Sequence, residues 1–273
     1  MPAVLTLERS GHVATVWLDR PEARNAMGAD LWHELPTVMD SLGEDPDVRA
    51  VVIAARGDHF SVGLDLKEFG PALMEGFGED PDPGASGRLS TRAQVKRMQH
   101  TMTAIARCPK PVIVAVHGYC IGAGVDLITA CDIRLAAADA VFSVRETRMG
   151  MVADVGTLQR LPRIIDPGRV AELAYTGRDV GADEAREMGL VSHVYGDRDE
   201  LFKAAMELAE QIAANSPLAV QGSKAVLAAT ADMSLTEALD YVSVWNAAFL
   251  HSNDLREAVT AFLEKRPPEF DGT

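Results

Sequence analysis

The chain has 273 residues and a formal net charge of −14, from 26 Lys and Arg against 40 Asp and Glu. General binders of nucleic acid and of membrane surfaces need a net cationic face, so this acidic balance argues against both classes. Hydrophobic residues make up 47% of the chain, which is enough to bury a sizeable core. An anionic ligand would have to be held by local Lys or Arg side chains or by helix N-termini.

The chain has no pattern typical of a metal site or of a targeting signal. Its three cysteines have no tight C-x-x-C spacing and its seven histidines are scattered, which predicts reduced thiols and no metal. The N-terminus lacks the apolar core of a secretion signal, and no apolar run reaches the roughly 20 residues that span a bilayer. The final FDGT is not a peroxisomal address. These features predict a soluble, cytoplasmic protein without a membrane segment.

The first predicted elements are short strands followed by a helix. Val4–Leu7 and Val13–Leu18 are β-branched runs joined by Ser10-Gly11-His12, which indicates a hairpin. A helix is expected from about Gly28 to Leu42, and the apolar run Ala50–Ala55 predicts a buried strand. Strands and helical segments then alternate, a pattern typical of α/β layers.

A different composition marks residues 70 to about 92. Gly, Pro, Asp and Glu crowd Gly70–Arg88 without an apolar period, so this segment is predicted to be a mobile surface loop. After it, Pro111–Val116 predicts a buried strand that enters the glycine-rich turn GYCIGAG, with a helix from about Ala123. A further apolar strand is expected at Ile133–Ala137.

The last third of the chain is predicted to be helical. Residues 1–200 would form the core, and residues 201–273 would form an appendage too thin to bury much by itself. We therefore expect it to pack on the core and on neighbouring subunits. Capping residues predict three helix starts: Ser216 before Pro217, Ser234 with Glu237 in a capping box, and Asn253.

Two glycine-containing turns, His59–Leu66 and His117–Gly124, are candidate anion or oxyanion sites. Glycine permits close approach of a ligand to the backbone, and free N–H groups at a helix start can stabilise negative charge. From glycine alone, tight packing is the favoured alternative. A dinucleotide-binding fingerprint is disfavoured because the third glycine is missing after G-A-G. His117 is expected to be a packed, hydrogen-bonded side chain and not a catalyst.

Several motifs, in this order and spacing, resemble the crotonase (enoyl-CoA hydratase/isomerase) superfamily over nearly the whole chain: LDRPEARNAM (Leu18–Met27), FSVGLDLKEF (Phe60–Phe69), CPKPVIVAVHGYCIGAGVDL (Cys108–Leu127), CDIRLAAADAVF (Cys131–Phe142) and GTLQRLPRII (Gly156–Ile165). The resemblance implies an α/β fold, a spiral of ββα units with a helical C-terminal region that builds trimers or dimers of trimers. It also implies an oxyanion hole formed by the N–H groups of Leu64 and Ala123, an acyl-CoA substrate and no separate cofactor.

Three carboxylates specify the subgroup that this chain resembles. Asp126 and Glu146 occupy the positions of the two catalytic glutamates of the hydratases, and Asp154 stands where the hydratases have glycine. This set is similar to that of the Δ3,5-Δ2,4-dienoyl-CoA isomerases. By analogy, Glu146 would serve C2, Asp154 would serve C6, and Asp126 would tune the pair. One departure from the subgroup is Thr147-Arg148, where an apolar residue and an acid are typical.

Each acid also has a purely structural alternative. Asp154 could cap a helix, Asp126 could interact with a helix dipole, and Glu146 could form a surface ion pair with the neighbouring arginines. The alternative enzyme is an enoyl-CoA hydratase on the same scaffold, although shortening its first glutamate to Asp126 disfavours it. An RNA-binding homologue of the superfamily is a further alternative, which the acidic balance disfavours.

The resemblance also implies residues that contact the CoA substrate. Arg24, Lys67 and Lys265 are candidate cations for its phosphates and adenine, with Lys265 reaching a neighbouring subunit's ligand; solvated surface charges are the alternative. The remaining candidates come from the same motifs: Ala26, Val62, Gly63, Asp65 and Gly122.

Overall fold

A computed structural model describes residues 4–75 and 84–273. Its main sheet has the strand order β1-β2-β3-β4-β6-β9, in which β1 and β2 form an antiparallel hairpin and the other neighbours are parallel. The strands are β1 (Leu5–Ser10), β2 (Val13–Leu18), β3 (Ala50–Ala55), β4 (Val112–Val116), β6 (Ile133–Ala137) and β9 (His193–Tyr195). The predicted hairpin is thus confirmed, with its first strand continuing to Ser10.

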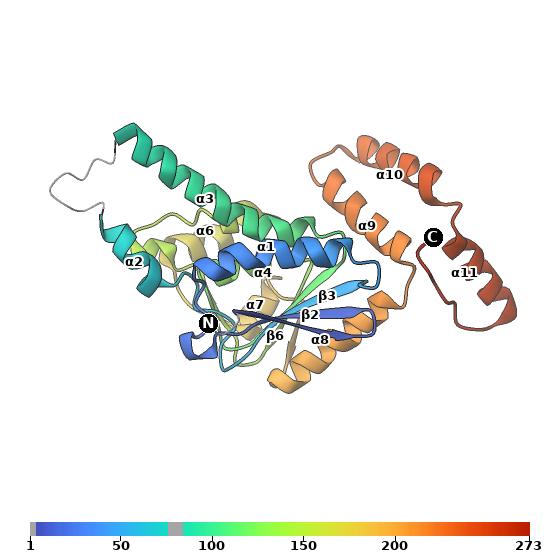
Figure 1. The fold of residues 1–273 in the computed structure, drawn as a ribbon, viewed down its shortest axis with the longest axis horizontal. Coiled ribbons are helices and arrows are strands. Elements are labelled where there is room, and N and C mark those ends of the chain that lie inside the picture. The colour runs from blue at the N-terminus through green and yellow to red at the C-terminus, as the bar shows by residue number, and fades with distance from the viewer. Residues whose placement is uncertain (1–3, 76–83) are drawn as a thin grey trace.

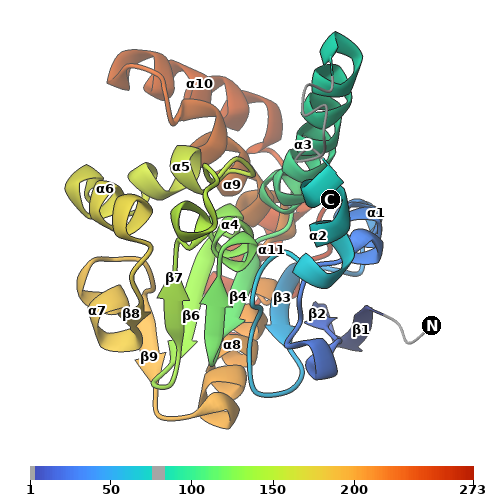
Figure 2. The ribbon, with the colours of Figure 1, turned by 90° about the vertical axis from the view of Figure 1, so that its left-hand side faces the viewer.

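A smaller sheet consists of β5 (Tyr119–Ile121), β7 (Val141–Ser143) and β8 (Val180–Gly181). β5 directly follows β4, and β7 directly follows β6, so the chain steps from the large sheet to the small sheet twice in succession (Figure 2). After β5 it enters α4 (Ala123–Ala130). This repeated step confirms the predicted α/β spiral of ββα units.

The main sheet is covered on both faces. Alternate residues of β3 point into two different clusters: Val51 and Ile53 pack with α1 (Ala29–Glu44), and Val52 packs with α8 (Arg198–Ala213). Figure 1 shows α1 and α8 on opposite sides of the strands. Because both faces are buried, the strands are continuous apolar runs and not alternating ones.

The predicted mobile loop is wrong where the structure describes it. Residues 70–75 lie in α2 (Leu66–Glu75) and residues 84–92 in α3 (Gly84–Arg107), while residues 76–83 lie outside the described residues. The buried residues of α3 all lie near its C-terminal end, and its N-terminal half extends beyond the core (Figure 1). A solvent-exposed helix has no apolar period, which explains why the pattern indicated a loop.

Between β7 and β9 the chain forms short elements that carry much of the site. They are η2 (Glu146–Met149), α5 (Thr157–Arg160), η3 (Leu161–Arg163), α6 (Pro167–Thr176) and α7 (Ala182–Glu187). Figure 2 shows α5 next to α4 at the end of the sheet from which β4 leads into α4. A 3-10 helix, η1 (Pro21–Ala23), precedes α1.

Three helices stand apart from the sheet and form what we call the C-terminal arm: α9 (Pro217–Thr230), α10 (Leu235–Phe249) and α11 (Asn253–Glu264) (Figure 1). The caps at Ser216 and Ser234 are confirmed. The predicted cap at Asn253 is wrong: Ser252 adopts the extended backbone one residue earlier, and its Oγ accepts the N–H of Leu255. Within the described residues, no helix is both long and apolar enough to cross a membrane.

Candidate active site

The two glycine-containing turns lie side by side. Ser61 donates its N–H to the carbonyl of Tyr119 at 2.8 Å, and Ile121 donates its N–H to the carbonyl of Ser61 at 3.0 Å. These two bonds form a short parallel bridge between segments about sixty residues apart in the sequence. The bridge brings Gly63 and Leu64 next to the start of α4.

Because Gly63 has no side chain, it leaves space around two main-chain donors, the N–H groups of Leu64 and Ala123. Its φ is +85°, and a Cβ at this position would lie 2.6 Å from the carbonyl oxygen of Ile121 and 3.2 Å from the nitrogen of Ala123. Among the described residues, neither Leu64 N–H nor Ala123 N–H has a main-chain or side-chain acceptor. Ala123 is the first residue of α4, where an N–H has no partner within its own helix. Two open donors therefore converge where an oxyanion hole is predicted.

Buried Asn25 holds the first of these turns in place. Its Nδ2 donates to the carbonyls of Arg56 and His59 at 2.9 and 2.8 Å, and its own carbonyl accepts the hydroxyl of Ser61 at 2.8 Å. Asn25 has a φ of 52°, a conformation that asparagine tolerates better than most residues. The motif around it was recognised, but this role of Asn25 was not predicted, because an asparagine at a turn has many explanations.

Asp126 lies on α4, three residues after the donor Ala123, and its side chain is buried. Its Oδ1 accepts two hydrogen bonds from Thr157, from the main-chain N–H at 2.6 Å and from the hydroxyl at 2.7 Å. Burial raises the pKa of Asp126 to about 6, while both bonds from Thr157 and the charge of Arg160 act in the opposite direction. The two hydrogen bonds favour the ionised form of this carboxylate and fix it in one orientation.

Glu146 begins η2, and its carboxyl group lies against the second glycine turn. Its Oε1 lies 3.5 Å from where a Cβ on Gly122 would be, next to the open N–H of Ala123. Its Oε2 is buried without a hydrogen-bond partner among the described residues. The neighbouring arginines bond elsewhere, Arg145 to Asp179 and Arg148 to the carbonyl of Thr176. The alternative of a surface ion pair at Glu146 is therefore not supported.

Glu146 has a pKa that allows it to gain or lose a proton near neutral pH. Burial raises the pKa of Glu146 to about 7, and the negative charges of Asp126 and Asp154 act in the same direction. A carboxyl group with a pKa in this range can both accept and release a proton under physiological conditions.

Asp154 is the most exposed of the three acids and does not cap a helix. The residue that precedes α5 is Gly156, so the structural alternative of an N-cap at Asp154 is not supported. Its main-chain carbonyl accepts a 2.6 Å hydrogen bond from Nε2 of Gln99 on α3. Partial burial raises the pKa of Asp154. The charge of Asp154 raises the pKa of both Asp126 and Glu146, so the three predicted acids lie within electrostatic range of one another.

The family model of enoyl-CoA hydratase/isomerase matches residues 8–273, almost the whole described fold. The chain belongs to this family. It is 45% identical over 253 residues to the peroxisomal Δ(3,5)-Δ(2,4)-dienoyl-CoA isomerase of Arabidopsis thaliana, covering 93% of this chain and 90% of the relative. It is 46% identical over 259 residues to the mitochondrial Δ(3,5)-Δ(2,4)-dienoyl-CoA isomerase of Rattus norvegicus, covering 93% and 77%. The resemblance to the dienoyl-CoA isomerase subgroup is thereby confirmed.

Solved structures of the enoyl-CoA hydratase/isomerase family share the fold of this member. The crystal structure of an enoyl-CoA hydratase from Bacillus anthracis has a TM-score of 0.89 and 33% identity, and the match covers 99% of this chain and 100% of that one. The predicted crotonase fold is therefore confirmed across the spiral and the helical C-terminal region.

The expectation of a cytoplasmic protein is wrong by the same comparison. The relatives are named as peroxisomal in Arabidopsis thaliana and as mitochondrial in Rattus norvegicus, which points away from a plainly cytoplasmic location. Location is specified by signals that receptors recognise, and neither fold nor composition encodes them.

The predicted CoA-binding residues divide into those near the first glycine turn and Lys265, which lies elsewhere in the chain. Val62 lies in the first glycine turn, and its N–H donates to the carbonyl of Arg24, so Arg24 and nearby Ala26 lie beside this turn. Lys67 is exposed at the start of helix α2. Asp65 has structural partners: it pairs with Arg20 at 3.2 Å and accepts the N–H groups of Lys67 and Glu68.

Lys265 does not join the site within one chain. It ends α11 in a left-handed conformation, in the C-terminal arm at the opposite end of the molecule from α2 (Figure 1). His117 is buried, with Nε2 2.9 Å from the carbonyl of Gly57, as expected of a packed histidine. In the described part of the chain, no cluster of His, Cys, Asp and Glu has the arrangement of a metal site.

Proposed function

We propose that this chain is a Δ3,5-Δ2,4-dienoyl-CoA isomerase, which moves a conjugated diene toward the thioester of a fatty acyl-CoA. The observation that carries the proposal is the group of three interacting carboxyl groups, Asp126, Glu146 and Asp154, together with two main-chain donors that have no acceptor among the described residues. Relatives that bear this enzyme name, at 45% and 46% identity over 93% of the chain, support it. CoA is part of the substrate, so the reaction needs no separate cofactor.

The reaction begins at the acidified C2–H of a 3,5-dienoyl thioester. Its removal gives a dienolate whose negative charge extends from the thioester oxygen to C6. The N–H groups of Leu64 and Ala123 would stabilise the oxygen end, and one such donor typically contributes about 3–4 kcal/mol. A main-chain donor does not depend on side-chain identity, so leucine and alanine are suitable there.

Two acids then complete the transfer. Glu146 would accept the C2 proton, since it lies against Gly122 beside the donor that would bind the thioester oxygen. Asp154 would deliver a proton to C6, so that one C–H bond breaks, one forms, and the double bonds move from 3,5 to 2,4. The pair holds one proton in total and titrates as a coupled set. After turnover the proton returns from Glu146 to Asp154, directly or through solvent.

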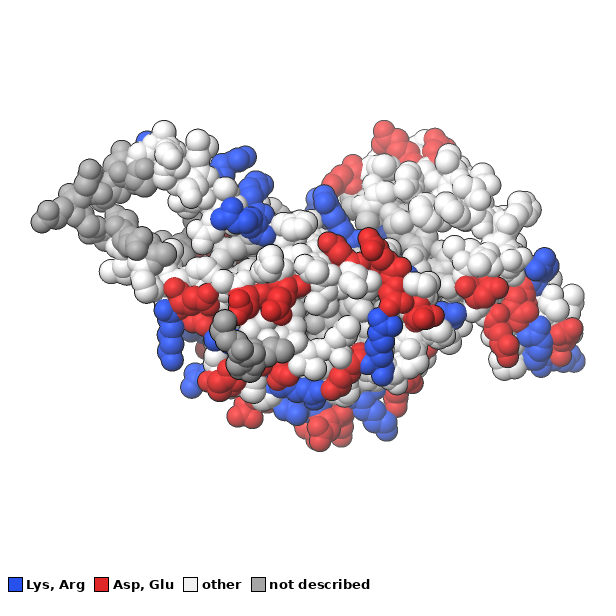
Figure 3. Space-filling model, in the orientation of Figure 1, with Lys and Arg blue, Asp and Glu red and all other residues white. Residues whose placement is uncertain are grey.

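The same proposal includes assembly into trimers, singly or in pairs, through the C-terminal arm. Among the described residues, α10 has no buried side chain, and large apolar residues of the arm are exposed, including Leu235, Val244 and Phe262. Figure 3 shows a largely uncharged surface over α9 and α10, whereas charged side chains gather at α11. Exposed apolar patches of this kind are typical of subunit interfaces. A neighbouring subunit would also bring a ligand within reach of Lys265.

An ultraviolet assay tests the function. A 3,5-dienoyl-CoA and a 2-enoyl-CoA are each mixed with the protein, and growth of the conjugated 2,4-diene band with little loss of the enoyl band is expected. Asp154→Asn should slow the isomerisation by about 10²–10⁴-fold, the usual contribution of a positioned acid. Rapid loss of the enoyl band without a diene band would show a hydratase instead. An Asp154→Asn rate within about threefold of wild type would contradict the role of Asp154.

Sedimentation of the wild type and of Leu235→Glu with Leu239→Glu tests the assembly. We expect a trimer or hexamer for the wild type and a shift toward monomer for the variant, since both leucines are exposed on α10. A monomeric wild type would contradict this part of the proposal without affecting the proposed reaction.

A further inference from the structure

Thr157 contributes two hydrogen bonds to one oxygen of a buried acid. Its side chain is fully buried, and both its N–H and its hydroxyl donate to Oδ1 of Asp126, at 2.6 and 2.7 Å. The two residues come from different elements, α4 and the start of α5, so the contact also joins these helices. Hydrogen bonds to an ionised group favour the charged form and fix its orientation.

We propose that Thr157 is a positioning residue for the isomerisation, which holds the Asp126 carboxylate ionised in one orientation and so leaves the transferable proton to Glu146 and Asp154. This inference rests on the proposed function. It explains how three acids within one site can have different roles, because Glu146 Oε2 has no hydrogen-bond partner among the described residues whereas Asp126 Oδ1 has two.

The other charged or titratable groups near Asp126 do not fulfil this role. Arg160 on α5 acts on Asp126 through its charge, but its guanidinium donates to the carbonyl of Val155 and the hydroxyl of Thr103, not to the carboxylate. Asp154 and Glu146 are like charges, and Cys120 on β5 is a buried neutral thiol whose pKa burial raises well above its usual value. In the described structure, only Thr157 donates hydrogen bonds to the Asp126 carboxylate.

The chain offers a matched control. Thr129 is a second buried threonine, and its hydroxyl donates at 3.0 Å to the main-chain carbonyl of Asp126, not to its carboxylate. Thr157→Val and Thr129→Val therefore remove the same hydroxyl from the same neighbourhood at constant volume. Thr157→Ser keeps the hydroxyl and removes only a methyl group.

The first experiment is the pH dependence of kcat and kcat/KM for a 3,5-dienoyl-CoA. For Thr157→Val we expect kcat to fall about tenfold, KM to stay within about twofold, and the acidic limb of the profile to rise by roughly one pH unit, because Asp126 then competes for the proton. Thr157→Ser should restore both parameters, and Thr129→Val should match the wild type. A Thr157→Val profile equal to that of Thr129→Val would overturn the inference.

A second measurement remains decisive if Thr157→Val fails to fold or if the wild type lacks isomerase activity. Carbon-13 NMR of carboxyl-labelled wild-type protein follows the titration of Asp126 and Glu146, with their signals assigned from Asp126→Asn and Glu146→Gln. We expect Asp126 to ionise at lower pH than Glu146. The opposite order would overturn the role of Thr157 while leaving the proposed reaction to the ultraviolet assay. Absence of diene isomerisation by the wild type would instead contradict the proposed function.

Discussion

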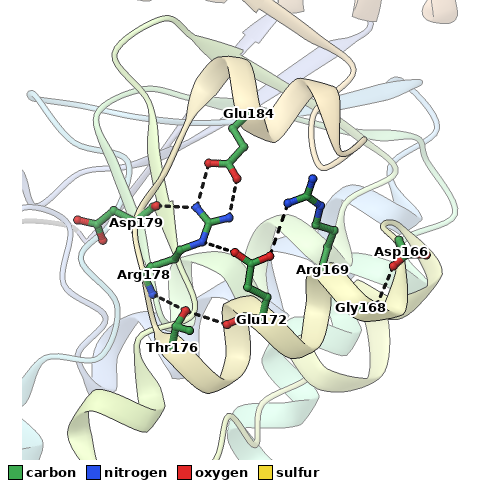
Figure 4. A network of polar contacts seen from close by, with 8 residues as sticks. All are labelled: Asp166, Gly168, Arg169, Glu172, Thr176, Arg178, Asp179 and Glu184. Atoms are coloured by element: carbon green, nitrogen blue, oxygen red, sulfur yellow. Dashed lines mark hydrogen bonds and ion pairs between the residues drawn. The ribbon is translucent and has the colours of Figure 1, made fainter.

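Two groups of carboxylates in this chain have opposite surroundings. Glu172 and Glu184 both bond the guanidinium of Arg178, Glu172 at 2.7 Å and Glu184 at 2.5 and 2.9 Å (Figure 4). Hydrogen bonding to Arg178 lowers the pKa of Glu184. In the active site, by contrast, burial raises the pKa of Glu146 to about 7, and no cation among the described residues bonds this carboxyl group. Arg178 thus favours the ionised form of Glu184, whereas Glu146 can exchange a proton near neutral pH.

The comparison shows that position, and not residue type, determines what a carboxylate does here. An arginine guanidinium that donates two hydrogen bonds to a carboxylate stabilises its ionised form. Such a carboxylate cannot serve as a proton carrier. A buried carboxyl group beside like charges has a free-energy cost when ionised, and that cost makes its proton available for transfer near neutral pH. The three active-site acids therefore stabilise the fold less than the carboxylates that are bonded to Arg178.

The two regions are physically joined through the end of α6. The hydroxyl of Thr147 donates to the carbonyl of Ala174 at 2.9 Å, and Arg148 Nε donates to the carbonyl of Thr176 at 3.1 Å. Thr147 and Arg148 are the two residues that we expect to depart from the subgroup pattern. Both bond to α6, so they fix η2 and with it the position of Glu146.

The largest expected effect is on the rate of Glu146→Gln. The amide keeps the size of the side chain but cannot accept the C2 proton, so kcat should fall about 10²–10⁴-fold. The same change in the other group, Glu184→Gln, should leave kcat within about twofold, because Glu184 has its charge fixed by Arg178. Both rates are measured by the growth of the diene band. A similar loss in both variants would mean that the amide substitution acts through folding and not through proton transfer.

Glu146→Gln should be more stable than the wild type at alkaline pH. With its pKa raised from 4.5 to about 7, folded Glu146 binds more protons than the unfolded chain between those values. Its favourable contribution is therefore complete below about pH 4.5 and lost as the pH rises through about 7. Glu146→Gln should exceed the wild type by on the order of 2 kcal/mol at about pH 8, and by much less at about pH 5. Urea unfolding at the two pH values measures this difference, and an equal gain at both would contradict it.

Breaking the connection between the two regions should have a smaller effect. Thr147→Val keeps the volume of the side chain and removes its bond to the carbonyl of Ala174, which typically costs about 0.5–1.5 kcal/mol. Because η2 then has one hydrogen bond to α6 fewer, kcat should fall a few-fold with KM nearly unchanged. Thr147→Ser, which keeps the hydroxyl, is the matched control. If the serine variant is as impaired as the valine variant, the hydrogen bond is not the cause.

The sequence allowed much of this molecule to be predicted, for identifiable reasons. The buried strands were found because both faces of the sheet are apolar, and Asp126, Glu146 and Asp154 were proposed because their spacing resembles that of a known subgroup. What could not be predicted depends on contacts distant in sequence. Thr157 bonds a residue 31 positions away, and nothing local distinguishes it from an ordinary threonine at a helix start. Likewise, α3 was missed because its exposed half has no apolar period.

The smallest expected effect is on the stability of Glu184→Gln, and its sign is opposite to that of Glu146→Gln. Glu184 has its pKa lowered by Arg178, so its contribution is present above its unfolded pKa and is lost as the pH falls through the folded value. The pair is partly exposed, which limits the expected loss to under about 1 kcal/mol at about pH 8. Urea unfolding should show this small loss shrinking as the pH falls below the unfolded value of 4.5, and 1 M salt should reduce it. A gain in stability at alkaline pH would mean that the Arg178 pair costs as much to desolvate as the acids of the active site, and the contrast between the two regions would then have to come from geometry alone.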